Sequence, residues 1–452
     1  MRQSIELFSQ EPGEWSGIMN LKSLVRIGTV LSLTIAGLIW PVGSVVAQAK
    51  EVEIKIAYIK HPIQVASIAL LEKWASTHNV KLIKYELSYP VYLQKITASL
   101  ASGGDQFDII WHNDDWGQMW KSWLETTDDV AGMDKVAKST LLSFYDDNGK
   151  LTVVPMVHTV NTFFYRKDLL TEKEVPTTWD ELVKISQRLQ QEGKVKWGYV
   201  GGMAMNYTWH SFWWSMWSNG CDVFMPIYER HNGVLEKAGW KPALTEPCTL
   251  DYMNFWWDAL FKNKISPPSM TSYTGDEALA VFMAGDAAFT VNDTNLYQLF
   301  NDPKRSKIVD KIGMAPWPMG PRTSKPVAYD DIWGWAIPKG APAENKKIAK
   351  EMLGASLTDQ EGQISLWKAT GGPPPNTDVW PILEKTDPVF AEEKRAVFDH
   401  VSTFHAAYYT EKWPAIHKAY SDVVVGALRG KREDIPKALE AGMGPVHDAA
   451  VP

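Results

Sequence analysis

The chain has 452 residues, with 46 Lys and Arg against 53 Asp and Glu and a formal net charge of -7. That length suits two or three ordinary domains or one two-lobed unit, and a content of 45% hydrophobic and 22% charged residues excludes a disordered chain. The acidic total, without a Lys/Arg-rich run, argues against a nucleic-acid partner. The unusual feature is 22 tryptophans, which favour an aromatic-lined ligand site in addition to a core.

The first fifty residues have the pattern of a secretory signal peptide. Lys22 and a nearby arginine precede an apolar run that ends at Trp40, and small-residue cleavage patterns follow at Ala47 and Ala49. The apolar run is too short for a good membrane span. We therefore expect residues 1–49 to be an N-terminal extension and signal peptide, and the mature protein to be soluble and periplasmic.

Two cysteines, Cys221 and Cys248, are present in the chain. Export to an oxidising compartment favours a disulfide between them. The alternative is a pair of buried free thiols. We therefore predict a Cys221–Cys248 disulfide, which would contribute about 3–4 kcal/mol in the chain-entropy model.

The first part of the mature chain alternates strands and helices. Apolar periodicity predicts a strand at 52–59, a helix at 65–76, a strand at 81–85, a helix at 92–102 and a strand at 107–111. Strands that alternate with helices are typical of βαβ units and a mainly parallel sheet.

Short strands are expected next at 153–156 and 163–165, before a helix whose start is marked by a Thr178–Glu181 capping box. The further elements expected are a strand at 197–200, helices at 209–218, 251–262 and 278–283, and strands at 287–291, 312–315 and 333–337. From residue 344 onward the pattern is almost wholly helical.

Five runs along the mature chain carry a family likeness. They are Phe107–Trp111, Gly149–Pro155, Phe163–Leu170, Pro176–Leu182 and Phe282–Phe289, and the most recognisable is Pro-Thr-Thr-Trp-Asp-Glu-Leu at 176–182. In this order the runs resemble the extracellular solute-binding proteins of ABC importers. The resemblance is to the large sugar-binding group that includes maltose- and trehalose-binding proteins.

The resemblance implies an α/β fold with two lobes, three hinge crossings and a ligand cleft between the lobes. Residues 50–157 with 291–333 would build one lobe, and residues 158–290 with 334–452 would build the other. It also implies the function: a periplasmic binding component that closes over a carbohydrate and delivers it to the transmembrane subunits of an ABC permease. Members of the family are usually monomers.

The candidate ligand contacts are aromatic residues and Asp or Asn at strand ends, together with those at the hinge crossings that the resemblance implies. Sugars stack their C–H faces on rings and bind carboxylates and amides through hydroxyls. These residues are Asp114, Asp115, Trp116, Asn161, Tyr207, Trp209, Asn292, Asp293, Asp331, Trp333 and Trp335. Trp333 is expected to be the main stacking platform, because its segment resembles the ligand segment of the family.

Structural roles are the alternatives for several of these residues. Asp114 or Asp115 could cap a helix with Trp116 in the core, and Asn292 and Asp293 could form a solvated turn. Another ligand class is also open, because an aromatic surplus with Asp residues could form a cage for a quaternary ammonium, a polyamine or a sugar alcohol.

A secreted carbohydrate-active hydrolase is the alternative of a different class. The carboxylate pairs 114/115 and 330/331 could supply an acid and a nucleophile, but neighbours on an extended chain point to opposite faces. The ten histidines lack metal-binding spacing, and no glycine-rich nucleotide loop occurs. The sequence therefore predicts a binding protein without enzymatic activity, metal or cofactor.

Overall fold

The structure is a computed structural model that describes residues 51–137, 141–204, 207–225, 230–231, 234–235, 241–401 and 410–450. The predicted signal peptide and the side chain of Trp209 lie outside the described part. None of the helices in the described ranges has the length and apolar character needed to span a membrane.

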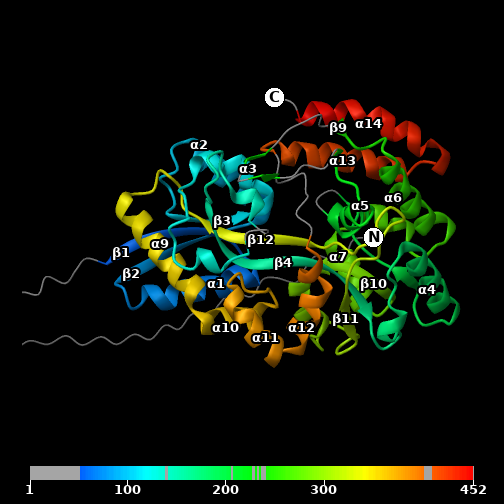
Figure 1. The fold of residues 1–452 in the computed structure, drawn as a ribbon, viewed down its shortest axis with the longest axis horizontal. Helices are drawn as coiled ribbons and strands as arrows, with labels where there is room; N and C mark the ends of the chain where they lie inside the picture. The colour runs from blue at the N-terminus through cyan, green and yellow to red at the C-terminus, as the bar shows by residue number, and fades with distance from the viewer. Residues whose placement is uncertain are drawn as a thin grey trace, which may run out of the picture. The chain divides into compact units, whose positions relative to one another are not determined.

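One eight-stranded sheet runs through the described residues (Figure 1), with the strand order β2-β1-β3-β12-β4-β10-β5 and β11 paired to β4. The strands are β1 (Val52–Ile59), β2 (Val80–Leu87), β3 (Ile109–Asn113), β4 (Val153–Arg166), β5 (Trp197–Tyr199), β10 (Ala287–Asp293), β11 (Ile312–Ala315) and β12 (Tyr329–Ala336). Two short ribbons pair β6 (Phe224–Met225) with β9 (Lys241–Pro242), and β7 (Arg230–His231) with β8 (Val234–Leu235).

The sheet is mixed, which corrects the predicted mainly parallel arrangement. β1 is parallel to β2 and β3, and β10 is parallel to β5, as βαβ units require. The centre is antiparallel, because β12 pairs antiparallel with both β3 and β4, and β4 pairs antiparallel with β10 and β11. β12 is the last strand among the described residues and pairs in the middle of the sheet. No helix lies between β11 and β12, so no crossover helix requires β12 to be parallel to its neighbours.

A single 14-residue strand, β4, replaces the two short strands predicted at 153–156 and 163–165, and it is buried along its whole length. The polar run from His158 to Asn161 interrupts the apolar pattern, which is why the sequence suggested a break. Neighbouring strands instead complete the hydrogen bonds of this segment, since β12 pairs with β4 as far as Asn161.

The major helices are α1 (Pro62–Ala75), α2 (Tyr89–Ala101), α4 (Trp179–Gln191), α5 (Phe212–Trp217), α6 (Pro247–Trp257), α7 (Gly275–Met283), α9 (Ala343–Thr358), α10 (Gln360–Thr370), α11 (Trp380–Thr386), α12 (Pro388–Ala396), α13 (Trp413–Leu428) and α14 (Ile435–Ala450). The predicted cap of α4 is confirmed, with one shift. Thr178 accepts from the Glu181 amide, and the Glu181 carboxylate accepts most closely from the Thr177 amide, at 2.8 Å.

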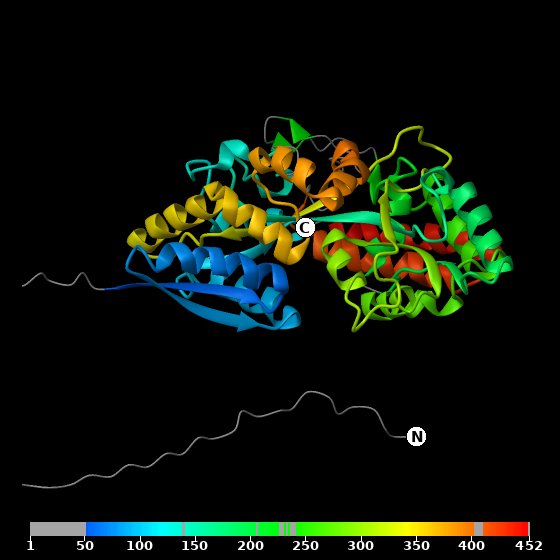
Figure 2. The same cartoon turned by 90° about the horizontal axis from the view of Figure 1, so that it is seen from below.

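Two main hydrophobic cores form around this sheet. The first contains β1, β3, the start of β4 and the end of β12, and it includes α9, which packs beside α1 (Figures 1 and 2). The second contains the end of β4, β10, α4 to α6, α13 and α14. The chain therefore changes core three times: along β4, back along β12, and again before α13. This is the two-lobed α/β organisation.

Beyond residue 290 the packing differs from the predicted lobe boundaries of 291–333 and 334–452. Met314 and Trp317 pack with residues of the second lobe, whereas Met352 and Leu353 of α9 pack in the first core. The reason lies in strand pairing. β10 and β11 both hydrogen-bond to the far end of β4, so only β12 carries the chain back to the first core.

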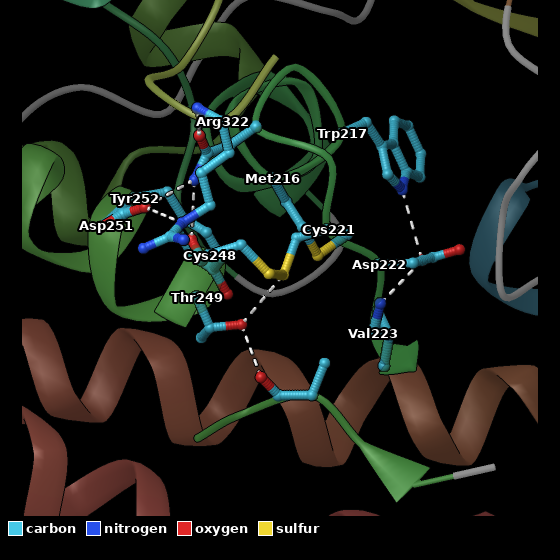
Figure 3. Close-up of a disulfide and its surroundings, with 12 residues drawn as sticks. Met216, Trp217, Cys221, Asp222, Val223, Cys248, Thr249, Asp251, Tyr252 and Arg322 are labelled. Carbon is cyan, nitrogen blue, oxygen red and sulfur yellow. Dashed lines mark hydrogen bonds and ion pairs between the residues drawn. A yellow bond between two sulfur atoms is a disulfide. The ribbon is translucent and has the colours of Figure 1, made fainter. Parts of the chain in front are cut away.

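The predicted disulfide joins Cys221 to Cys248 (Figure 3). It connects the loop after α5 to the first turn of α6, and both cysteines are buried in the second core. Around it, Arg322 forms an ion pair with Asp251, and Trp217 donates to Asp222. The disulfide therefore joins two residues 27 positions apart and fixes this buried part of the second lobe.

Replacing both cysteines, as Cys221→Ser with Cys248→Ser, should lower the free energy of unfolding by about 3–4 kcal/mol, because the unfolded chain regains loop entropy. Chemical denaturation monitored by tryptophan fluorescence measures this difference. As the control, thiol titration of the denatured wild-type chain should find no reactive thiol before reduction and two afterwards. Two thiols before reduction would contradict the bridge.

Candidate ligand-binding site

Three adjacent strands place polar side chains on one face of the sheet, at the junction of the two cores. Asn161 of β4 lies opposite Tyr329 of β12 and opposite Asp293 of β10. Asp331 comes two residues after Tyr329 on β12 and lies opposite Thr159, and Trp333 comes two residues after Asp331. Because side chains two apart on a strand point to the same face, this register brings Tyr329, Asp331 and Trp333 into one row.

A short helix after β3 adds a second group to this place. Asp114 and Asp115 lie in this helix, η1 (Asp114–Trp116), which contacts both β12 and α13. The Tyr329 hydroxyl donates to Asp114 Oδ2 at 2.6 Å, and the Trp333 indole donates to Asp331 Oδ2 at 3.2 Å. Two elements from different cores, η1 and α13, therefore meet at this row.

We call this group the junction cluster. Its members are Asp114, Asp115, Trp116, Asn161, Asp293, Tyr329, Asp331, Trp333 and Trp413. Trp413, the first residue of α13, hydrogen-bonds to the Asp115 carboxylate. Of the predicted contacts, the structure thus brings together Asp114, Asp115, Asn161, Asp293, Asp331 and Trp333, while the Trp116 ring beside them is buried in the first core.

Aromatic rings form the wall of the junction cluster on the side of the first core. The Trp333 ring meets Trp111 edge-on at a centroid distance of 5.1 Å and His61 at 4.9 Å. Trp111 meets Trp116 at 4.9 Å, and Tyr89 lies 51% exposed at the rim, 6.4 Å from Trp116. Trp333 is only partly buried, so it is the tryptophan of this wall that can offer a ring face.

Sequence reasoning missed His61, Tyr89, Tyr329 and Trp413. His61 and Tyr89 each follow a strand that the sequence predicts, so the strand-end rule applied to β1 and β2 would have found them. Tyr329 lies in a segment where no strand was expected. Nothing in the local sequence distinguishes Trp413 from a core residue, because its contact with Asp115 comes from the packing of α13 on η1.

The electrostatics of the junction cluster are dominated by four carboxyl groups. Removal from water raises the pKa of Asp115, Asp293 and Asp331 to about 8 each, and nearby carboxyls add to the shift for Asp115 and Asp331. Burial also raises the pKa of Asp114 well above its usual range, and Asp331 beside it adds to that effect. Burial lowers the pKa of the neighbouring His61 to about 4, so its imidazole is neutral at pH 7.

The junction cluster also holds an unused hydrogen-bond acceptor. Asn161 is 4% exposed, and its side-chain carbonyl oxygen has no hydrogen-bond partner among the described atoms. A buried polar atom without a partner costs free energy unless a ligand or water fills that role. This atom therefore marks a place where a ligand donor would bind.

Of the remaining predicted contacts, two lie elsewhere, one lies near the rim of the junction cluster and one lies outside the described part. Asn292 pairs with Thr162 on the opposite face of the sheet, and Trp335 is buried in the first core, where it donates to Ser67 at 3.0 Å. Tyr207 packs against His210, and its phenol lies close enough to Tyr89, at the rim of the junction cluster, to help raise the pKa of Tyr89. The side chain of Trp209 lies outside the described residues.

A groove of about 670 Å³ lies on the second lobe, between α4, α6 and the loop at 319–321. Three of its charged residues have protein partners, since Arg432 pairs with Asp258 and Asp251 pairs with Arg322. This groove shares no residue with the junction cluster and lacks the aromatic row of β12. It is therefore a weaker candidate for a solute site.

Across the described ranges, no three His, Cys, Asp or Glu side chains converge in a way that could hold a metal ion.

The sequence model of the family of bacterial extracellular solute-binding proteins matches residues 69–394 of this chain. That match spans well over half of the chain, so the chain belongs to this family, which consists of binding proteins.

Two curated relatives are similar over part of their length. The mannitol-binding protein of Pseudomonas aeruginosa is 26% identical over 300 residues, which make up 60% of this chain and 63% of that protein. A probable ABC transporter-binding protein of Deinococcus radiodurans is 27% identical over 209 residues, which make up 45% of this chain and 47% of that protein. The chain thus spans less than two thirds of each relative.

Solved structures share the fold over most of the chain. MalE3 of T. maritima with maltose bound aligns with a TM-score of 0.69 at 24% identity, covering 87% of this chain and 99% of that one. An ABC transporter solute-binding protein from Agrobacterium vitis S4 with bound D-mannitol aligns with a TM-score of 0.66 at 21% identity, covering 88% and 97%. At these identities the likeness establishes the two-lobed fold.

Asp331→Asn should raise the melting temperature of the ligand-free chain more at pH 8 than at pH 5. The folded chain keeps the Asp331 proton up to about pH 8, whereas the unfolded chain releases it near its ordinary value of 3.8. Folding stability therefore falls as pH rises between these values, and an uncharged Asn removes that loss. Thermal unfolding at several pH values measures the effect.

Asp105→Asn, at an exposed position, is the matched control and should leave the pH dependence unchanged. An equal shift for Asp331→Asn at pH 5 and pH 8 would show that Asp331 ionises normally in the folded chain.

Proposed function

We propose that this chain is the periplasmic binding component of an ABC importer, and that it takes a sugar or polyol in the junction cluster. The observation that carries the proposal is the partly exposed Trp333 ring beside Asp331, Asp114 and Asn161, where β4 and β12 pass between the two cores. A ring face next to carboxylate and amide acceptors matches the apolar faces and hydroxyl donors of a sugar.

The relatives support this ligand class. The mannitol-binding protein of Pseudomonas aeruginosa is named for a polyol, and the solved neighbours hold maltose and D-mannitol. On this proposal Trp333 stacks on the ligand, the carboxylates accept from hydroxyls, and the Asn161 carbonyl accepts one more hydrogen bond.

The two cores would move as rigid bodies connected by β4 and β12. η1 and α13 come from different cores and touch at Asp115 and Trp413, so this contact would form on closure and open on release. Transmembrane permease subunits would distinguish the closed, loaded monomer from the open one. No catalytic step is proposed, and incubation with oligosaccharides should release no product.

A ligand screen tests the proposal. Thermal shift and tryptophan fluorescence of the purified chain would be measured with mono- and disaccharides, sugar alcohols, sugar phosphates, betaine, choline and polyamines. A rise in melting temperature with a neutral or aminated sugar or a polyol supports the proposal, since a ligand that binds only the folded state stabilises it. A response confined to non-carbohydrate cations would refute the sugar or polyol class.

Trp333→Ala should weaken binding of the best ligand by about 1–3 kcal/mol, because the variant loses the stacking face. Isothermal titration measures the loss. Trp74→Ala is the matched control, since Trp74 is also partly buried but stacks on His78 at the far end of α1. Unchanged affinity in Trp333→Ala would remove this ring from the site.

A further inference from the structure

The groove of about 670 Å³ between α4, α6 and the loop at 319–321 takes no part in the proposed function. We call it the second-lobe groove, because both helices contribute to the second core (Figure 1). Its volume lies within the range of roughly 300–1,000 Å³ that is typical of small-molecule sites. The groove is therefore large enough to hold a ligand of its own.

Two helices line the second-lobe groove, each with one strip of its surface. On each helix the lining residues follow the i, i+3, i+4, i+7 spacing of a single face. They are Asp180, Val183, Lys184 and Gln187 of α4, and Asp251, Asn254, Phe255 and Asp258 of α6 and the π-helix η8 (Asp258–Lys262) that continues it. Seven residues of helix span about 10 Å, so two such strips suit an elongated ligand.

A stacked pair of aromatic rings lines the groove between these strips. Trp179 and Phe255 lie at a centroid distance of 4.8 Å with an interplanar angle of 29°. Phe255 is only partly buried, so part of its ring can contact a ligand. Trp179 is 5% exposed, and its indole N–H has no hydrogen-bond partner among the described atoms. A ligand oxygen would satisfy that donor.

Protein contacts hold the walls of the groove in place. Arg432 binds the Asp258 carboxylate through two nitrogens, at 2.9 and 3.2 Å, and Arg322 pairs with Asp251 (Figure 3). Two backbone hydrogen bonds connect the loop at 319–321 to the start of α4. Walls that are fixed before binding reduce the cost of ordering the site around a ligand.

The charges in and beside the groove balance. Asp251 and Asp258 are each paired with an arginine, and Asp180 and Lys184 of α4 carry opposite charges. A ligand with a net charge would therefore gain little attraction from the groove, and a neutral ligand suits it better.

The polar groups that remain for a ligand include three amides. Among the described atoms, no hydrogen bond uses the side chains of Gln187, Asn254 or Asn263. Each amide offers both donors and an acceptor, and Gln187 and Asn254 stand on opposite walls. Donors and acceptors beside a partly exposed ring match the hydroxyls and the C–H faces of a saccharide.

We propose that the second-lobe groove is a second carbohydrate site, which binds a neutral oligosaccharide outside the junction cluster. One sugar ring packs on Phe255, and its hydroxyls exchange hydrogen bonds with the amides of Gln187 and Asn254. The inference does not depend on the proposed function, because the groove shares no residue with the junction cluster.

Fluorine NMR of the purified chain, labelled with 5-fluorotryptophan, tests the inference at the groove itself. The Trp179 resonance is assigned as the signal that is missing from Trp179→Phe. It is then followed during titration with maltose, maltotriose, cellobiose and diacetylchitobiose, and separately with the peptide Gly-Gly-Gly. We expect at least one saccharide to shift the Trp179 resonance until it saturates, and the peptide to have no effect.

Variants on the two walls locate the ligand. Phe255→Ala should weaken binding of that saccharide about 10-fold, and Gln187→Ala about 3-fold, because they remove a ring contact and a hydrogen bond. Gln191→Ala is the matched control and should leave the affinity unchanged, since Gln191 is an exposed residue of α4 that does not line the groove. If the melting temperature shows that Phe255→Ala does not fold, Gln187→Ala decides the test.

The outcomes separate the groove from the junction cluster. A Trp179 response that persists in Trp333→Ala supports the inference. A response that is lost in Trp333→Ala but kept in Gln187→Ala and Phe255→Ala overturns it, because Trp179 would then sense the junction cluster from a distance. The absence of a Trp179 shift with every saccharide also overturns the inference and leaves the proposed function standing. A shift with the peptide alone overturns the carbohydrate class of the groove.

Discussion

The pairing of β4 with β12 is the constraint on which the rest of the structure depends. Each strand contributes to both cores, and the register between them runs from Tyr329 opposite Asn161 to Ala336 opposite Val153. The pleat therefore decides which polar residues face the junction cluster and which face away. Asp331 points into the cluster, whereas its neighbour Asp330 points to the other face and bonds His158 Nδ1 at 2.8 Å. A shift of one residue would exchange these two roles.

In the junction cluster, folding stability and ligand binding place opposite demands on the carboxyl groups. Burial raises the pKa of each of the four carboxyls, and neighbouring carboxyls add to this for Asp114, Asp115 and Asp331. Folding is therefore favoured when they hold protons and disfavoured as they ionise. A ligand that satisfies them reverses this loss, and its binding energy includes the relief of repulsion. Residues chosen only for stability would not be placed in this way, which is why the carboxyls indicate a binding role.

Local sequence patterns predicted what local forces determine. The bounds of β1 and β11 agree with the strands expected at 52–59 and 312–315, and Thr178 caps α4 as its sequence indicates. The continuity of β4 could not be predicted, because its polar residues are tolerated only through pairing with strands far along the chain. The central antiparallel strands and the return of α9 to the first core have the same origin, since they depend on contacts between distant segments.

The candidate site was predictable to the extent that strand ends determine it. Asp114 and Asp293 were found by that rule, whereas Asn161 was chosen for its place at an expected hinge crossing and lies inside β4. Asn292 was misplaced because the rule does not say which face a residue takes. The number of tryptophans did not help, because many of them, such as Trp120, Trp214 and Trp256, are fully buried in the cores.

What distinguishes Trp333 is its combination of contacts. Its indole N–H is held by Asp331, while the edge-on rings of Trp111 and His61 fix its orientation. A ring held in this way loses little conformational entropy when a ligand stacks on it. The same hydrogen bond keeps a carboxylate beside the ring, so the apolar face and the charge that a ligand would contact are positioned together. On the proposed function, the specificity of this site would come from a tryptophan–aspartate unit on one strand, with the other aromatic residues holding that unit in place.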